Sequence, residues 1–506
     1  MNAKTIQNTV TVLSAKDMEG RGTATPGGDR AAQWIADQFA ALGLKPAGEN
    51  GTYLQPVAFK SSQINSESSV TAGTVALKFG EEFVPAPPFT MDKTSASGDL
   101  VFVGYGVAST DLARDDFAGL DVKGKIVVVL SGRPKNSDEA KWTKSVNQQT
   151  LIGGLVQRGV AGIVVAGYDT PERSFSKISG YLTRRSVSLA SVAQMPFQLP
   201  PIVLTSSAGA EKLFAASGAT FADAKTKAET GEFASRALGT TGNMTIIVDR
   251  KEGKGSNVAA VLEGSDPTLK AQAILYTAHY DAFGLTNSGG YYPGAADNAL
   301  GVGEIIAIAE AMSKDKNRPR RSIVFLAVTG EEYGLLGAKY WADHPTWPLE
   351  NVAANINYDG IGTEIYGPVK QVVGFGAEYS DIGTVFEQAV VATGMRSVPD
   401  PMPEEKAFYR SDHYAFVKKG VPALMLLGGP DGPTEVWIKR ANEWLEKDYH
   451  QTTDVIGADW DWGGARTVAT IGLVVGMRLA AADAMPQWLA SSPFQRPAKA
   501  AAAAGN

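Results

Sequence analysis

The residues best suited to chemistry in this chain are its few histidines and the acids near them. Only four histidines occur among 506 residues, at positions 279, 344, 413 and 450. His279 ends the apolar segment AILYTA, and Asp281 follows two positions later. This spacing is typical of an imidazole that binds a metal through one nitrogen while a carboxylate holds the other. The pair therefore predicts a metal ligand with a partner that orients it.

Further carboxylates follow apolar segments in the second half of the chain. Asp297 precedes the helix-like segment ALGVGEI, the pair Glu331-Glu332 follows IVFLAVTG, and Asp359 follows NINY. Together with two histidines, three of these acids form a donor set that suits two Zn²⁺ ions, because Asp can bridge through its two oxygens. Glu331 is then left beside a ligand, where a carboxylate can act as general base toward a metal-bound water.

Two histidines compete for the last ligand position. His450 lies in the loop DYHQTTD, and His413 lies in RSDHYAF before a helix-like stretch. If His450 is the ligand, we expect Asp412 and His413 near the cleft, behind the ligands. His344 lies at a predicted helix end before a proline, and we interpret it as a partner of the helix dipole.

Each acid also has an ordinary structural interpretation. Asp297 could cap the helix that follows it, and Asp359 could belong to a turn. The adjacent glutamates could be a solvated surface pair. Their shared position favours function, because most of these residues lie at the C-terminal end of an apolar strand. In an open α/β sheet, ligands bind at that edge.

The elements that must position these residues alternate along the chain. Apolar strands are predicted at 271–278, 322–329, 352–358 and 421–427. Amphipathic helices are predicted at 29–44, 300–312, 335–344 and 379–393. Such alternation predicts an α/β fold with a mixed, largely parallel central sheet flanked by helices. Upstream of these elements, segments 243–251 and 256–264 predict an antiparallel pair around a turn at 252–255.

A different pattern interrupts the chain between residues 100 and 238. It contains strand-like runs at 100–107 and 123–132 and a helix-then-strand step at 151–167, which predict a smaller α/β or β-rich domain. We therefore expect a discontinuous catalytic domain at 1–99 and 239–490 with an inserted domain at 100–238. The last residues, 491–506, are expected to form a low-complexity tail, frayed from Arg496 onward.

Composition limits the classes of function. The absence of cysteine excludes disulfides, thiolate zinc sites and cysteine nucleophiles. Lys and Arg number 47 against 53 Asp and Glu, so with no long basic run we expect no nucleic-acid partner. No apolar run reaches the roughly 20 residues of a membrane span, so none is expected. The first residues lack a signal-peptide pattern, which predicts either a cytosolic protein or a signal removed before this numbering.

The series HYD, ADN, GEE, YDG and YH resembles the M28 family of co-catalytic zinc aminopeptidases. The intervals also fit, with 34 positions from Asp297 to Glu331 and 27 from Glu332 to Asp359. Five motifs in this order make the resemblance specific. Residues 20–48 are similar to the entry helix of the family, and the segments at 116–132 and 159–167 are similar to a protease-associated (PA) insert domain.

The resemblance implies a cofactor of two Zn²⁺ per chain. One ion would be held by His279 and Asp359, and the other by Glu332 and His450. Asp297 would bridge the two. The resemblance thus favours the YH loop over the earlier histidine for the last ligand.

The resemblance also implies roles around the metals. Glu331 would be the base that activates the bridging water, and Asp281 would orient the histidine before it. Tyr449 would help to stabilise the oxyanion. A cis peptide bond is expected at Asp297–Asn298.

The implied activity is hydrolysis of the N-terminal peptide bond of a peptide substrate. A carboxypeptidase or dipeptidase with the same site is the nearest alternative, because the sequence does not show how the chain terminus is held. A glutaminyl cyclase-like transferase fits less well, since that chemistry usually needs one zinc. A receptor-like interaction protein is disfavoured by the complete ligand set. Members of the family are mostly exported, which implies a periplasmic or secreted location, and the sequence leaves the oligomeric state open.

Overall fold

The structure is a computed structural model that describes residues 1–169, 174–193, 198–215, 217–232, 235–287, 289–360 and 363–497. The chain divides into two compact units. The first comprises Met1–Lys60, Val187–Ser191 and the chain from Glu252 onward, and the second comprises Ser61–Ser186 and Val192–Lys251. The second unit thus begins before residue 100 and ends after residue 238, the bounds expected for the insert. Its ends lie within strands β2 (Leu54–Ile64) and β13 (Arg236–Leu262), which belong to both units.

A mixed sheet forms the centre of the first unit. Its strands follow the order β1 (Lys45–Pro46), β13, β15 (Ser322–Val328), β14 (Ala273–His279), β16 (Val352–Tyr358), β19 (Ala423–Pro430), β17 (Val369–Phe375) and β18 (Arg396–Ser397). The four strands from β15 to β19 are parallel neighbours, whereas β13 and β17 run antiparallel to theirs. Every residue of β14, β15 and β16 is buried, as expected for parallel strands covered on both faces. The predicted mixed, largely parallel sheet is confirmed.

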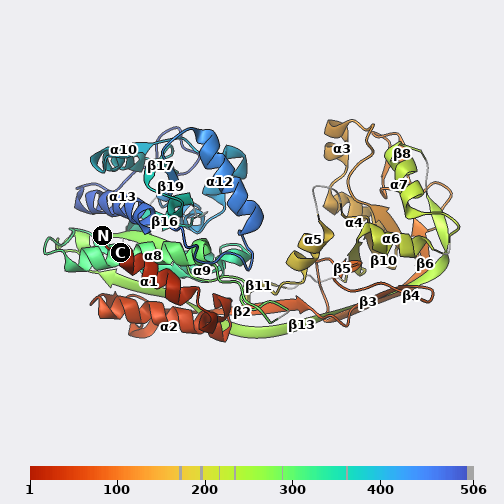
Figure 1. The fold of residues 1–506 in the computed structure, drawn as a ribbon, viewed down its shortest axis with the longest axis horizontal. Helices are drawn as coiled ribbons and strands as arrows, with labels where there is room; N and C mark the ends of the chain where they lie inside the picture. The colour runs from red at the N-terminus through yellow and green to blue at the C-terminus, as the bar shows by residue number, and fades with distance from the viewer. Residues whose placement is uncertain are drawn as a thin grey trace, which may run out of the picture. The chain divides into compact units, whose positions relative to one another are not determined.

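Helices cover this sheet. They are α1 (Ala3–Leu13), α2 (Pro26–Ala41), α8 (Leu300–Lys314), α9 (Leu336–Asp343), α10 (Ile382–Ala392), α11 (His413–Val417), α12 (Thr434–Lys447) and α13 (Trp462–Ala481). In Figure 1, α1 lies against α8, and both contribute to the largest apolar core. The four predicted helices correspond to α2, α8, α9 and α10. His344 is the C-terminal cap of α9, where its backbone N–H donates to the carbonyl of Tyr340.

Helix α13 is the one helix in the described part of the chain that is long and apolar enough to cross a membrane. Its buried face packs into the core of the first unit, and glycines bring it close to the sheet. A Cβ on Gly472 would lie 1.7 Å from Oη of Tyr358, and one on Gly476 would lie 1.8 Å from Oη of Tyr276. The Tyr276 hydroxyl donates to the carbonyl of Gly472 over 2.9 Å. The glycines therefore set the spacing between α13 and strands β14 and β16.

The second unit has its own sheet and core. Its strands follow the order β4 (Val75–Ala76), β3 (Ser69–Ala72), β13, β6 (Lys93–Phe102), β9 (Ile126–Leu130), β10 (Gly162–Ala166), β12 (Ile202–Thr205) and β5 (Phe83–Pro85). Helices α3 (Glu139–Ser145), α4 (Gln148–Gln157), α5 (Phe175–Leu182), α6 (Ser207–Phe214) and α7 (Phe221–Glu229) accompany it. Two apolar clusters lie on the faces of this sheet, so the unit is a small α/β body.

Two sequence predictions fail in this fold. Segments 243–251 and 256–264 form one continuous strand, β13, because its first half pairs with β3 and β6 while its last residues pair with β15. Each half finds its backbone partners elsewhere, so no turn is needed at 252–255. The chain is also not frayed from Arg496, whose guanidinium donates to the carbonyls of Val352 and Ala353. Residues 498–506 lie outside the described residues.

Candidate metal centre

The five predicted ligands meet at the C-terminal edge of the parallel strands. His279 ends β14, and Asp359 directly follows β16. Glu332 lies in the single helical turn Glu331–Tyr333 that follows β15. Asp297 lies just before α8, and His450 lies in the loop between α12 and α13. Segments spread over more than 170 positions therefore bring nitrogen and oxygen donors to one place.

The donor atoms form two triads that share Asp297. In the first, Nε2 of His279 lies 3.2 Å from Oδ1 of Asp297 and 3.2 Å from Oδ1 of Asp359. In the second, Nε2 of His450 lies 3.4 Å from Oδ2 of Asp297 and 3.0 Å from Oε2 of Glu332. Within each triad all donor atoms lie within 4.8 Å of one another. Imidazole nitrogens and carboxylate oxygens at this spacing fit Zn²⁺.

The charges of these groups call for a cation. Burial would lower the pKa of His279, but Asp359 and the other surrounding acids raise it well above its ordinary value. Burial likewise opposes protonation of His450, yet Glu332 and Asp297 raise its pKa to about 9. Burial and the neighbouring Asp297 raise the pKa of Glu332 to about 7. Closely spaced, buried carboxylates repel one another, and a divalent ion between them relieves that repulsion.

Glu331 lies beside the triads and belongs to neither. Its Oε2 is 3.8 Å from Nε2 of His279. Burial raises the pKa of Glu331 well above its ordinary value, and Asp359 adds to that shift. Its side chain lines the same pocket as Asp297 and Asp359. The carboxylate is therefore available to exchange a proton with a group bound at the triads.

Asp281 connects three parts of the site. Nδ1 of His279 faces it, 3.2 Å from its backbone carbonyl oxygen and 3.7 Å from its Oδ1. The carboxylate accepts hydrogen bonds from the backbone N–H of Glu331 over 3.1 Å and from the hydroxyl of Thr23 over 2.9 Å. These bonds fix the orientation of Asp281 between the ligand at the end of β14 and the turn after β15.

A buried arginine hydrogen-bonds to the backbone beside the site, and the sequence analysis did not identify it. Arg21 is fully buried, and its guanidinium donates to the backbone carbonyls of Leu13, Tyr280, Pro293 and Gly294. Burial lowers the pKa of Arg21 to about 10, with Asp454 the strongest opposing charge, so the side chain remains charged at neutral pH. The motif GRG marks this place in the sequence, but nothing in it distinguishes a buried arginine from an exposed one.

The backbone around Asp297 is also held by neighbours. The Asp454 carboxylate accepts hydrogen bonds from the N–H groups of Ala296 and Asp297 over 2.9 and 3.0 Å. The side chain of Asn298 donates to the carbonyl of Tyr358 over 2.8 Å, which ties this segment to the residue before Asp359. The peptide bond between Asp297 and Asn298 is cis, as predicted. Asp454 was missed, because an acid in a polar loop carries no signal of its own.

The remaining predicted residues lie near the triads. The ring of Tyr449 stacks on His450 with centroids 3.6 Å apart, and its hydroxyl lies 3.4 Å from Nη2 of Arg410. Asp412 and His413 are fully buried at the start of α11, and neither belongs to a triad. Burial raises the pKa of Asp412 well above its ordinary value and lowers the pKa of His413 to about 4.

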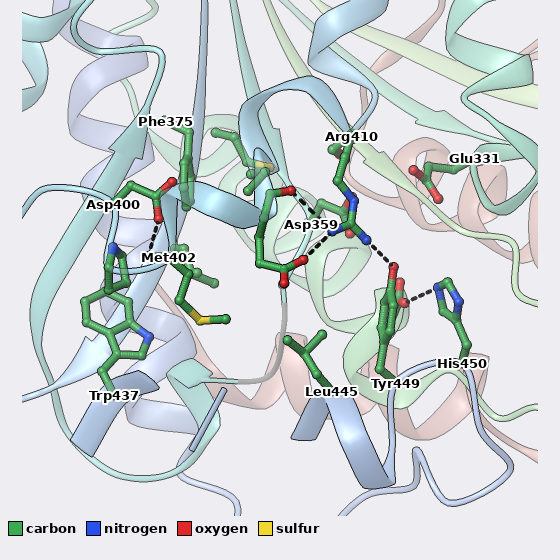
Figure 2. A pocket seen from close by; sticks show the side chains of 18 residues that line it. Glu331, Asp359, Phe375, Asp400, Met402, Arg410, Trp437, Leu445, Tyr449 and His450 are labelled. Carbon is green, nitrogen blue, oxygen red and sulfur yellow. Dashed lines mark hydrogen bonds and ion pairs between the residues drawn. The ribbon is translucent and has the colours of Figure 1, made fainter. Parts of the chain in front are cut away.

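A pocket opens beside the triads (Figure 2). Its lining includes Asp297, Glu331, Asp359, Phe375, Asp400, Met402, Glu405, Arg410, Met425, Leu427, Trp437, Leu445, Tyr449 and His450. The side chains nearest the triads are polar, whereas the middle of the lining is apolar. Nη1 of Arg410 pairs with Oε2 of Glu405 over 2.8 Å. The site therefore combines a candidate metal centre with a cavity that can receive a side chain.

Comparison with known proteins gives a matching family model and similar folds. Residues 257–475 match the model of peptidase family M28. The fold is similar to that of an aminopeptidase from Aneurinibacillus sp. strain AM-1, at 20% identity over 95% of this chain and 94% of that one, with a TM-score of 0.60. It is also similar to that of a zinc aminopeptidase from Bacillus subtilis, at 17% identity over 94% of each chain, with a TM-score of 0.57.

A curated relative corrects the expected location. The vacuolar membrane protease of Yarrowia lipolytica is 33% identical over 113 residues, which are 22% of this chain and 10% of that protein. The matched region thus spans about a tenth of the relative's length. The expectation of a periplasmic or secreted protein is wrong by this comparison, because the relative's name points to a vacuolar membrane. That expectation rested only on the usual location of family members. Residues 257–475, the stretch that resembles peptidase family M28, thus hold all five candidate ligands.

Proposed function

We propose that the protein is a two-zinc exopeptidase that removes the N-terminal residue of a peptide. The observation that carries this proposal is the pair of donor triads that share Asp297, with Glu331 beside them. In this proposal His279 and Asp359 hold one ion, while Glu332 and His450 hold the other. The zinc aminopeptidase fold supports the choice of metal.

Zinc at the two triads would lower the pKa of a bound water and polarise the scissile carbonyl. Glu331 takes the proton from the attacking water and delivers it to the leaving amine. Asp281 keeps the His279 ring in its orientation, so that Nε2 stays directed at the first triad. The hydroxyl of Tyr449 stabilises the oxyanion as a hydrogen-bond donor.

The charges of the pocket favour an amino terminus over a carboxyl terminus. Its lining near the triads carries the acids Asp297, Glu331 and Asp359. Arg410 is the one arginine or lysine among the described lining residues, and it is paired with Glu405. A substrate carboxylate would have to displace that pairing, whereas a free ammonium group meets an excess of acids. This balance supports an aminopeptidase over the carboxypeptidase or dipeptidase alternative.

The proposal is tested with leucyl and N-acetyl-leucyl p-nitroanilides. The zinc-restored protein should cleave the free substrate and not the acetylated one, and the chelated protein should cleave neither. Glu331→Gln should keep two zinc ions per chain by elemental analysis and lose about 10²- to 10⁴-fold in kcat. The exposed Glu350→Gln is the matched control and should leave kcat unchanged. Near-wild-type turnover by Glu331→Gln, or equal cleavage of the acetylated substrate, would contradict the proposal.

We also infer roles for two other parts of the chain. The insertion of the second unit between β2 and β13, with parallel strands β6, β9, β10 and β12, supports a protease-associated domain. The burial of α13 against β14 and β16 supports a core helix rather than a membrane span.

A further inference from the structure

The pocket has a second chemically distinct end, away from the triads. Figure 2 shows Asp359 and His450 toward one side of the pocket and Asp400 toward the opposite side. Between them lie the side chains of Phe375 and Met402. A substrate side chain that enters from the metal end therefore passes the paired Arg410 and Glu405 and apolar walls before it reaches Asp400 (Figure 2).

The local sequence fixes the position of this carboxylate. Asp400 stands between Pro399 and Pro401, and the following proline restricts its backbone to extended conformations. One carboxylate oxygen, Oδ1, accepts a hydrogen bond from the backbone N–H of Met402 over 2.8 Å. This bond to the backbone two residues on closes a tight turn of the kind that Asp side chains form. The carboxylate is thus anchored at the pocket lining.

The pocket wall beside Asp400 includes the tightly packed indole ring of Trp437. The Trp437 ring is buried against β19 at Gly429, where a Cβ would lie 2.4 Å from the indole. A larger residue at position 429 would push the indole into the cavity. Leu445, from the same helix α12, continues this apolar surface toward the metal end.

The charge of Asp400 has no partner of opposite sign within the described residues. It forms none of the ion pairs found there, and the pocket's arginine is engaged by Glu405. Asp400 is half-buried, and burial raises its pKa above the ordinary value, with Glu404 adding to that shift. An apolar ligand would bury this carboxylate further and leave it uncompensated, which is unfavourable. A ligand with a positive charge at its tip would compensate it.

We propose that this pocket selects peptides with an N-terminal lysine or arginine, whose alkyl chain lies along Phe375, Met402 and Leu445 and whose cation meets Asp400. The inference rests on the proposed N-terminal exopeptidase activity and adds the class of residue removed. A short side chain does not reach the carboxylate, because Asp400 lies at the end opposite the triads (Figure 2), and an uncharged side chain of full length leaves it uncompensated.

The test compares lysyl and norleucyl p-nitroanilides on the zinc-loaded full chain, because norleucine keeps the alkyl length and lacks the charge. The wild-type protein should show a kcat/KM for the lysyl substrate at least about tenfold above the norleucyl value. Asp400→Asn should lower the lysyl-to-norleucyl ratio by about tenfold to a hundredfold, the range expected for loss of a charge-assisted contact. Asparagine retains an oxygen that can accept from the Met402 N–H, so the turn is kept, and the norleucyl rate reports on folding.

Glu404→Gln is the matched control. Glu404 is an exposed acid on the same loop and does not line the pocket. Its substitution removes the same charge and should leave the ratio within about twofold. A wild-type preference for the norleucyl substrate overturns the inference, as does an unchanged ratio in Asp400→Asn or an equal fall in Glu404→Gln. Cleavage of neither substrate, with zinc bound, overturns the proposed exopeptidase function itself and with it this inference.

Discussion

Substitution of a single glycine in α13 should destabilise the protein although alanine is the better helix former. Gly472 lies inside the helix, and a Cβ there would be 1.7 Å from Oη of Tyr358, where about 3.4 Å is an ordinary contact. Gly→Ala in a helix interior normally gains about 1 kcal/mol. Overpacking of this kind costs about 3 kcal/mol, at the upper end of measured values. We therefore expect Gly472→Ala to lower the free energy of unfolding by about 2 kcal/mol.

A double-mutant cycle separates the clash from other effects. The Tyr358 hydroxyl is buried and has no hydrogen-bond partner among the described residues, so Tyr358→Phe alone should change stability by less than about 1 kcal/mol. In the double variant the nearest atom of the ring is Cζ, 2.9 Å from the new Cβ, and most of the overlap is removed. The coupling energy should be about 1–2 kcal/mol in favour of the double variant.

The assay is urea unfolding of the zinc-saturated protein, followed by tryptophan fluorescence. Gly153→Ala in α4 is the matched control, because nothing lies within 4 Å of its Cβ position, and it should be neutral or stabilising. If Gly472→Ala is as stable as Gly153→Ala, or if its loss simply adds to that of Tyr358→Phe, then the packing argument for α13 is wrong.

Three other substitutions or treatments test the surroundings of the site. Arg21→Met should lower the free energy of unfolding by about 3–5 kcal/mol, since four buried carbonyls lose their donor, and a loss below about 1 kcal/mol in urea unfolding would contradict this role. Burial raises the pKa of Glu364 from 4.5 to about 7, so the folded protein resists its ionisation and loses stability as the pH rises through this range. Glu364→Gln should remove about 3 kcal/mol of that loss between pH 5 and 8, and an unchanged pH dependence of unfolding would refute it. Chelation should lower the melting temperature, because repulsion among the ligand carboxylates returns, and added zinc should restore it; a calorimetric trace insensitive to chelator would argue against a metal in the fold.

Two of the candidate ligands could be predicted from local signatures in the sequence. His279 and Asp359 lie at the ends of strands that are apolar throughout, and such strands are visible as runs of residues. The acids after them share one sheet edge because parallel strands have the same polarity. The approximate positions of α2, α8, α9 and α10 could likewise be predicted, because helical periodicity is visible in a short stretch of sequence.

The rest depends on distant partners. Arg21 reaches carbonyls as far away as Gly294, and no short window of sequence contains that relation. Asp454 acts on the backbone of residues about 157 positions earlier. The prediction for β13 was wrong because the Gly-containing segment at 252–255 suggested a local hairpin. The first half of the strand pairs with β3 and its last residues pair with β15, so the two halves do not pair with each other.

The guanidinium of Arg21 limits how far the chain can be shortened from its N-terminal end. The stretch that matches the family model begins at residue 257, yet the guanidinium that donates to the carbonyls of Tyr280, Pro293 and Gly294 comes from residue 21. A fragment covering the matched stretch alone would leave the carbonyl oxygens of Tyr280, Pro293 and Gly294 without this hydrogen-bond donor. It would also lose a positive charge that stabilises the carboxylates of Asp454 and Asp281. Residues Met1–Lys60 are thus part of the same folded unit as the matched stretch, and a minimal stable version must retain Arg21.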